Sequence, residues 1–239
     1  FWRAYPPYRA LGLQFADLAC PETFRDDPAL AWGFYGHRLN LYRATAPHAG
    51  YGVLREWARR MPNGHFVFTS NVDGAFAVAG FDPDRIEECH GSIHHLQCAS
   101  PCSLDIRPAD GVRVAVDEST MRAVTPLPAC PRCGGLARPN ILMFGDGPWI
   151  ETRTGEQAER LQAWLMELRD ARAKVAIVEC GAGTAIPTVR YRSEHAALQL
   201  RGTLVRINVR EPNGPAGTIS LPIGAREALE RINAAIATA

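Results

Sequence analysis

The chain has 239 residues, of which 46% are hydrophobic and 21% charged, and its formal net charge at pH 7 is +1. This length can bury a substantial core in one domain or two, and the composition is that of a soluble globular protein. The small net charge gives no indication of nucleic-acid binding. No apolar run is long enough to span a bilayer and no secretory signal is visible. We therefore expect a cytoplasmic protein without membrane or nucleic-acid partners.

Two helices are predicted near the start of the chain. Asp27-Pro28 is a typical helix start, with Asp27 as the N-cap, and apolar side chains can line one face over residues 28–45. A second helix is predicted over residues 49–61, where Pro62-Asn63-Gly64 ends it. Residues 1–45 are expected to form the helical part of a small domain.

The stretch over residues 67–102 carries the densest set of polar motifs. An apolar strand leads into a polar turn with Asn71 and Asp73, and a second strand-like segment over residues 85–89 ends at His90-Gly91. Polar groups placed just past strand ends are where open α/β sheets carry their chemistry. A functional site is therefore expected to be organised around this stretch.

Four of the seven cysteines are paired in sequence as C-x3-C and C-x2-C, with 27 residues between the pairs: Cys98, Cys102, Cys130 and Cys133. This spacing is zinc-ribbon-like, and the alternative is two disulfides in a secreted protein. We favour one zinc ion per chain, because no secretory signal is visible and the other three cysteines are unpaired in sequence. Four thiolates leave no open position, so the zinc would be structural. Residues 105–128, between the pairs, are expected to form a small antiparallel unit, and His94 and His95 are treated as non-ligands.

The C-terminal half is expected to alternate strands with helices. An amphipathic helix is predicted over residues 157–172, with Thr154 as its N-cap in a capping box with Gln157. Buried strands are predicted over residues 175–178 and 204–207, as in a parallel sheet that is covered on both faces. A last helix follows Ala225 and runs to about residue 238. This alternation predicts a doubly wound parallel sheet.

A glycine-containing turn follows the first of these strands, at Gly181-Ala182-Gly183-Thr184. A strand followed by Gly-x-Gly and a helix is the plan of a phosphate or ribose site, although the third glycine of the dinucleotide fingerprint is missing here. The turn is therefore a candidate nucleotide-binding element whose signal is weak by itself.

Taken in order, these motifs resemble the sirtuin family, the NAD-dependent protein deacylases. The family has Thr-Gln-Asn-Ile-Asp-Gly, His-Gly, four zinc-binding cysteines and Arg-Pro-x-Ile-Val-x-Phe-Gly-Glu. The matching segments here are Thr69-Ser70-Asn71-Val72-Asp73-Gly74, His90-Gly91, the four cysteines above, and Arg138-Pro139-Asn140-Ile141-Leu142-Met143-Phe144-Gly145-Asp146. The resemblance implies an α/β fold with a doubly wound, Rossmann-like parallel sheet, a small zinc-ribbon module and a helical insertion. It implies an NAD-binding domain of residues 46–97 and 136–239 and a zinc module of residues 98–135.

The chain departs from the family pattern at three places. The family's Gly-Ala-Gly-x-Ser loop and Asp-Phe-Arg motif are absent, and Phe1 enters in mid-pattern. We expect residues before Phe1 that form a mobile cofactor loop, ordered by NAD. Ser70 replaces a glutamine, which removes a hydrogen bond to ribose. One extra residue precedes Glu211, so Asn208 is carried over more safely than Glu211.

The resemblance assigns roles to individual residues. His90 matches the histidine that acts as general base on a ribose hydroxyl, Asp73 would hold the nicotinamide carboxamide, and Asn71 would order the ribose or a water. The expected cofactor-binding residues are Ser70, Asn71, Asp73, Gly181, Gly183, Thr184, Asn208, Glu211 and Ala225. The residues expected to line the acyl-lysine tunnel and pair with the substrate as an added strand are Ile141, Leu142, Phe144 and Gly145. Whether Gly181 or Gly183 matches the family's glycine is left open.

The implied function is NAD-dependent deacylation of an acylated lysine peptide or protein, with nicotinamide and O-acyl-ADP-ribose as products. An NAD hydrolase or ADP-ribosyltransferase without peptide deacylation is the alternative, favoured by Ser70 and the altered motif at Asn208. A third interpretation, a non-catalytic NAD- or ADP-ribose-binding module, is opposed by the intact His90.

Overall fold

The computed structural model describes residues 5–238 and divides the chain into two compact units. Unit 1 comprises Phe1–Ala46, Asn71–Ala75 and Glu88–Glu156, and unit 2 comprises Pro47–Ser70, Phe76–Glu87 and Gln157–Ala239. The expected cofactor loop before Phe1 lies outside the described residues. Within residues 5–238, no helix is both long and apolar enough to cross a membrane.

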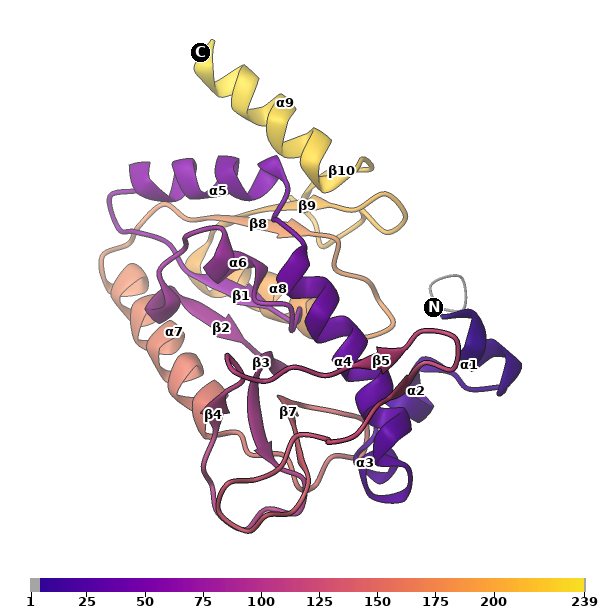
Figure 1. Ribbon diagram of the computed structural model, residues 1–239. Helices are drawn as coiled ribbons and strands as arrows, with labels where there is room; N and C mark the ends of the chain where they lie inside the picture. Colours follow the sequence, from indigo (N-terminus) through magenta and orange to yellow (C-terminus); the bar gives the residue numbers. More distant parts are fainter. Residues whose placement is uncertain (1–4, 239) are drawn as a thin grey trace. The chain divides into compact units, whose positions relative to one another are not determined.

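Unit 1 begins with a run of helices (Figure 1), and their buried side chains contribute to an aromatic core. Three short helices, α1 (Pro6–Ala10), α2 (Phe15–Leu18) and α3 (Pro21–Asp26), precede the long helix α4 (Pro28–Ala44). The predicted start of α4 is confirmed, since the Asp27 carboxylate accepts a hydrogen bond from the Leu30 amide at 3.1 Å. Trp32, Phe34 and Leu39 of α4 are fully buried in the core. The short helices were not predicted, because their apolar side chains show no helical period.

The rest of unit 1 is built on an antiparallel sheet. Strand β3 (Gly91–Cys98) lies between β4 (Arg107–Pro108) and β7 (Ala137–Ile141), with an irregularity between Ser92 and Leu96. A hairpin of β5 (Val116–Asp117) and β6 (Arg122–Ala123) is the small antiparallel unit expected within residues 105–128. Strand β3 therefore runs from His90-Gly91 at one end to Cys98 at the other.

Unit 2 contains the parallel sheet predicted from the alternation of strands and helices. Strands β8 (Ala176–Cys180), β9 (Thr203–Ile207) and β10 (Ile219–Leu221) are parallel in the order β10-β9-β8. Strands β1 (Val67–Thr69) and β2 (Ile86–Glu88) form a separate two-stranded sheet. The last residue of β2, Glu88, already belongs to unit 1. The helical elements of unit 2, of which α6 and α7 begin with residues of unit 1, are α5 (Ala49–Arg60), α6 (Ala75–Val78), η1 (Pro83–Arg85), α7 (Thr152–Asp170), α8 (Thr188–Leu200) and α9 (Ala225–Ala237). The predicted strands at 175–178 and 204–207 are confirmed, whereas β10 was not predicted.

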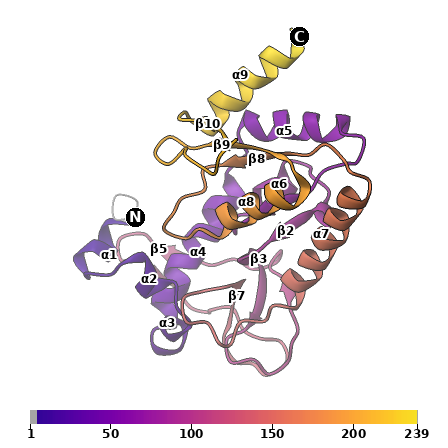
Figure 2. The same cartoon turned by 180° about the vertical axis from the view of Figure 1, so that it is seen from behind.

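The two faces of the parallel sheet in unit 2 have opposite character. Val205 and Ile207 pack against α5 and α9 in an apolar cluster that includes Trp57 and Leu229. The opposite face carries charged side chains toward α8, which Figure 2 shows below β8 and β9, on the side away from α5. Side chains alternate between faces along a strand, so Arg206, between Val205 and Ile207, belongs to the charged face.

One capping prediction is wrong. Helix α7 begins at Thr152, so Thr154 lies inside the first turn rather than at the N-cap. The Thr154 hydroxyl donates instead to the carbonyl oxygen of Glu88 at 3.3 Å. The Thr154 hydroxyl therefore bonds a carbonyl group that is distant in sequence, instead of the nearby backbone amide that a capping box requires.

Candidate active site and metal centre

The turn that carries Asn71 and Asp73 is attached to β3 in unit 1. The Ile93 amide donates to the carbonyl oxygen of Val72 at 2.9 Å, and the next residue, His94, places Nε2 2.9 Å from the carbonyl oxygen of Asp73. The Asp73 carboxylate accepts a hydrogen bond from the Ala75 amide at 2.9 Å. Two successive residues of one strand therefore fix the backbone on either side of the Asp73 side chain.

His90 immediately precedes the same strand. Its carbonyl oxygen accepts a hydrogen bond from the Leu142 amide at 3.0 Å, and Gly91 pairs with Ile141 of β7. Gly91 has φ +75°, and a Cβ there would collide with the Asn140 carbonyl oxygen, so only glycine fits this close approach. The backbone at His90 is therefore held in place by its pairing with residues 141 and 142.

Burial lowers the pKa of His90 below its ordinary value. The imidazole is therefore uncharged at neutral pH, which is the state in which it can accept a proton. Because β3 holds both the Asp73 turn and the residue after His90, unit 1 brings the sequence-predicted Asn71, Asp73 and His90 onto one rigid support.

The segment expected to line an acyl-lysine tunnel follows β7. Ile141 is buried, whereas Leu142 and Phe144 are 38% and 47% exposed. A fully buried ion pair fixes the turn beyond them, with Arg138 Nη2 2.7 Å from Asp146 Oδ1. The fixed turn leaves two large apolar side chains available to a ligand on the surface of unit 1.

The backbone of this segment is already partly used. The amides of Leu142, Met143 and Phe144 donate to the His90 carbonyl, the Asp146 carboxylate and the Ala19 carbonyl, respectively. A substrate strand added here would therefore use backbone carbonyls or the Gly145 amide. The Phe144 ring also meets the Phe15 ring edge-on, at 6.2 Å between centroids, which brings α2 beside the segment.

In unit 2, the two loops expected at the adenosine end of NAD contact one another. The Thr184 amide donates to Glu211 Oε2 at 2.9 Å, and the Thr184 hydroxyl donates to Glu211 Oε1. Asn208 donates through Nδ2 to the Ala182 carbonyl at 2.9 Å, and its Oδ1 accepts from the Glu211 amide at 2.9 Å. The Thr184 hydroxyl is the main cause of the lowered pKa of Glu211, which keeps that carboxylate charged.

The two glycines of this turn are required for different reasons. Gly181 adopts φ +71°, a conformation that favours glycine. A Cβ at Gly183 would stand 3.2 Å from the Glu211 carboxylate, so this position needs a small residue for close approach. Helix α8 starts only at Thr188, so the turn does not open directly into a helix N-terminus as the dinucleotide fingerprint does.

The remaining cofactor candidates flank these loops. Ser70 follows β1 directly. Ala225 is the first residue of α9 and packs in the apolar cluster around Ile207, the residue before Asn208. The structure therefore places Ala225 in the same unit and the same packing cluster as the strand that carries Asn208.

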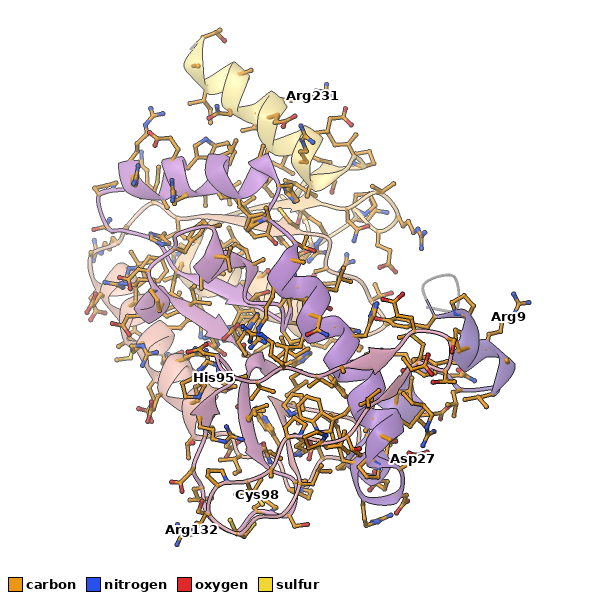
Figure 3. The ribbon with its side chains drawn as sticks, viewed as in Figure 1. Arg9, Asp27, His95, Cys98, Arg132 and Arg231 are labelled. Carbon is orange, nitrogen blue, oxygen red and sulfur yellow. The ribbon has the colours of Figure 1, made fainter. Side chains whose placement is uncertain are left out.

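The four paired cysteines come together at the far end of β3 in unit 1. Their sulfur atoms all lie within 4.8 Å of one another, and two pairs, Cys98–Cys133 and Cys102–Cys130, are 3.7 Å apart. A tetrahedral zinc ion with bonds of about 2.3 Å separates its sulfur ligands by about 3.8 Å. Figure 3 marks Cys98 and Arg132 in this region. The residues therefore fit a closed tetrahedral zinc site with no open position.

The environment of Cys130 favours its thiolate, whereas burial raises the pKa of Cys98 and of Cys102. The backbone amides of Cys133 and Arg132 are the main causes that lower the pKa of Cys130 to about 7. Gly134 adopts φ +72°, and its amide donates to the Cys130 carbonyl at 2.9 Å, which closes the turn around the sulfur. The cysteines are present as free thiols rather than disulfides.

Sequence reasoning missed two side chains that organise these sites. His94 binds the Asp73 carbonyl, 21 residues away, and Arg190 binds carbonyls near Glu211, also 21 residues away. A histidine beside a zinc-like motif and an arginine on a helix carry no local signal for such partners. Only the tertiary structure reveals them.

A sequence profile described as the Sir2 family matches residues 8–165, more than half of the chain. This chain belongs to the Sir2 family. Among Sir2 relatives, the NAD-dependent protein deacylase of Aeropyrum pernix is 31% identical over 224 residues, covering 92% of this chain and 79% of the relative. NAD-dependent protein deacylase 1 of Pseudomonas aeruginosa is 34% identical over 145 residues, covering 61% of this chain and 52% of the relative. The chain thus spans about half the length of several curated relatives that it matches.

Another similar protein carries a different activity name. A Fusarium oxysporum protein named as a probable bifunctional ADP-ribose hydrolase/ADP-ribosyltransferase is 27% identical over 220 residues, covering 87% of this chain and 36% of that protein. Among solved structures, an ADP-ribose complex of a Sir2 homologue aligns with a TM-score of 0.68 and 24% identity, covering 99% of this chain and 82% of that one. This structural likeness shows that the chain has the Sir2 fold.

Proposed function

We propose that this protein is an NAD-dependent deacylase of acylated lysine side chains in a peptide or protein. The observation that carries the proposal is the support shared in unit 1 by His90 and the Asp73 turn. Proton abstraction from a ribose hydroxyl needs an uncharged histidine, and binding of the nicotinamide carboxamide needs a polar side chain such as that of Asp73. Strand β3 supports both residues. Membership of a family that includes named deacylases adds to this support.

The residues present fit NAD in each unit. In unit 2, Thr184 and Glu211 offer a hydroxyl and a charged carboxylate suited to ribose hydroxyls. In unit 1, Asp73 and Asn71 offer a carboxylate and an amide suited to a carboxamide and a ribose. When bound, NAD supplies the ribosyl carbon that accepts the acyl oxygen and the nicotinamide that leaves.

The chain's own groups would then act as follows. Asp73 holds the carboxamide through its carboxylate, and Asn71 orders the ribose or a water. Leu142 and Phe144 contact the aliphatic stem of the acyl-lysine with their exposed apolar side chains. His90 accepts the proton of a ribose hydroxyl, and its lowered pKa keeps it ready to do so at neutral pH. A zinc ion held by the four cysteines would take no part in these steps and would stabilise unit 1.

The test compares products with and without an acylated peptide. The protein, NAD and an acetyl-lysine peptide are incubated, and nicotinamide, peptide mass and ADP-ribose species are measured by mass spectrometry. We expect nicotinamide release to require the peptide and to match formation of O-acyl-ADP-ribose. Peptide-independent NAD cleavage, or no NAD cleavage with a panel of acyl peptides, would overturn the deacylase proposal.

A second candidate is an NAD hydrolase or an ADP-ribosyltransferase. It is favoured by the Fusarium oxysporum relative and by Ser70, whose side chain is shorter than the glutamine of the family motif. Under this candidate the same incubation yields free ADP-ribose or an ADP-ribosylated protein, and the peptide keeps its acyl group.

A further inference from the structure

Arg190 of α8 ties together the two loops that hold Thr184 and Glu211 in unit 2. Its Nη1 donates to the carbonyl oxygens of Ala182 at 3.2 Å and Glu211 at 3.1 Å. Its Nη2 donates to the carbonyl oxygens of Glu211 at 3.1 Å and Asn213 at 2.7 Å. One guanidinium therefore links the turn after β8 with the loop after β9 through three carbonyl groups.

The geometry requires an arginine. The Arg190 side chain is 8% exposed, and Nη1 stands 3.8 Å from the Glu211 carboxylate, so its charge is partly buried beside an opposite charge. A planar fork with fixed donor directions can reach three carbonyls at once, whereas the ammonium of lysine is a point charge on a flexible stem. A lysine at this position would keep the charge and lose most of the link.

A second guanidinium fixes the same loop from the charged face of the sheet. Arg206 of β9 donates through Nη1 to the Asn213 carbonyl at 2.8 Å, and its other nitrogens bind Glu179 at 2.6 Å and Glu194 at 2.8 Å. Arg206 and Glu179 are fully buried, so they form a rigid base for the loop. Arg190 shares the Asn213 carbonyl with Arg206 and, like the Asn208 amide, reaches both loops.

We propose that Arg190 is a positioning residue for the adenosine ribose of NAD. It holds the backbone of Glu211 and of Ala182, and so sets the distance between the Glu211 carboxylate and the Thr184 hydroxyl, the two groups proposed to meet the ribose. This inference rests on the proposed function only in naming NAD as the ligand. Arg190 itself contacts neither the ribose nor the reacting atoms.

The test measures adenosine-end binding apart from catalysis. The variants Arg190→Lys and Arg190→Met are compared with Arg192→Met, a matched arginine on the same helix whose guanidinium lies over the Phe68 ring. ADP-ribose affinity is measured by calorimetry, and KM for NAD and kcat are measured with an acyl peptide. We expect the dissociation constant and KM to rise roughly tenfold or more in Arg190→Met and less in Arg190→Lys, with kcat nearly unchanged. Arg192→Met should leave both constants near those of the unaltered protein.

Hydrogen exchange separates positioning from loss of fold. Amides in residues 181–184 and 208–213 should exchange faster in Arg190→Met, while those of β9 keep their protection. Glu211→Gln combined with Arg190→Met should raise the ADP-ribose dissociation constant by less than the product of the single effects, because Arg190 acts through Glu211. Independent effects, or unchanged loop exchange, would contradict the positioning role.

The outcomes distinguish this inference from the proposed function. If deacylation is intact and Arg190→Met leaves KM and ADP-ribose affinity unchanged, the inference is wrong and the function stands. If no deacylation occurs but ADP-ribose binding depends on Arg190, the inference stands and the deacylase proposal is wrong. If the unaltered protein binds no ADP-ribose, the inference is overturned.

Discussion

Unit 1 holds its candidate residues through the backbone of one strand, whereas unit 2 holds its candidates mainly through side chains. The Asp73 turn is tied to β3 by one backbone amide and one imidazole, and His90, which directly precedes β3, accepts a hydrogen bond from the Leu142 amide. The loops with Thr184 and Glu211 are joined by a hydroxyl, a carboxylate, the Asn208 amide and the guanidinium of Arg190. A backbone support depends on the folding of the whole strand, but a side-chain support can be weakened one group at a time.

The difference matches the chemistry proposed for each unit. Proton abstraction requires a base whose position is fixed within a fraction of an ångström, and strand pairing provides such rigidity. Ribose recognition requires hydrogen bonds whose partners can be tuned individually. We therefore expect substitutions that affect unit 1 to change folding or turnover, and substitutions in the unit 2 loops to change NAD affinity.

The largest expected effect is on the metal centre of unit 1. Cys130→Ala removes one of four ligands from a closed site, and zinc binding of this type contributes folding free energy on the order of 10 kcal/mol. We expect loss of stoichiometric zinc and a poorly soluble protein, measured by metal analysis and thermal unfolding. Cys180→Ala, outside the cluster, should keep both zinc and stability. Stoichiometric zinc in Cys130→Ala would show that the cluster is not the metal site.

The next effect separates two chemical steps in unit 1. His90→Ala should lower deacylation about a hundredfold to ten-thousandfold, because a positioned base is lost, yet retain exchange of labelled nicotinamide, which needs no such base. Asp73→Asn should lose both activities, because it alters the group that holds the carboxamide. Label exchange and peptide deacylation are measured on the same samples. Equal losses in His90→Ala would mean that His90 is structural or acts earlier.

The pH dependence sharpens the comparison by isolating His90. Its lowered pKa means that the imidazole is uncharged above that pKa and loses its ability to accept a proton as pH falls through it. The acid limb of kcat/KM for deacylation should therefore have its midpoint below about 6.5, the ordinary histidine pKa. A midpoint at or above 6.5 would contradict an essential, half-buried and neutral His90.

The smallest expected effect concerns His94, whose imidazole links β3 to the Asp73 carbonyl. His94→Phe keeps a ring against Gly74 but removes the bond to the Asp73 carbonyl, and loss of one such bond should slow nicotinamide exchange by about threefold to tenfold. His94→Gln, which retains an amide donor, should recover part of the rate. An effect as large as that of His90→Ala would contradict the contrast between the two units, because the support in unit 1 would then depend on a side chain as well.

Local sequence patterns determined the elements whose signals lie within a few residues. The Asp27-Pro28 start of α4 follows from a cap that binds three residues on, and the two cysteine pairs are recognisable from their spacing. The strands at 175–178 and 204–207 follow from short apolar runs. These features depend on backbone geometry and hydrogen bonding within a few residues. The same short sequence is therefore expected to form them in other proteins as well.

Only the tertiary structure decided which polar side chains support the candidate sites. Thr154 binds the Glu88 carbonyl 66 residues away instead of capping its own helix, and Arg190 reaches Asn213, 23 residues along the chain. The sequence contains these donors but not the directions in which they point. A buried donor binds the acceptor that packing places beside it, because leaving either group unpaired costs more free energy than any local preference provides.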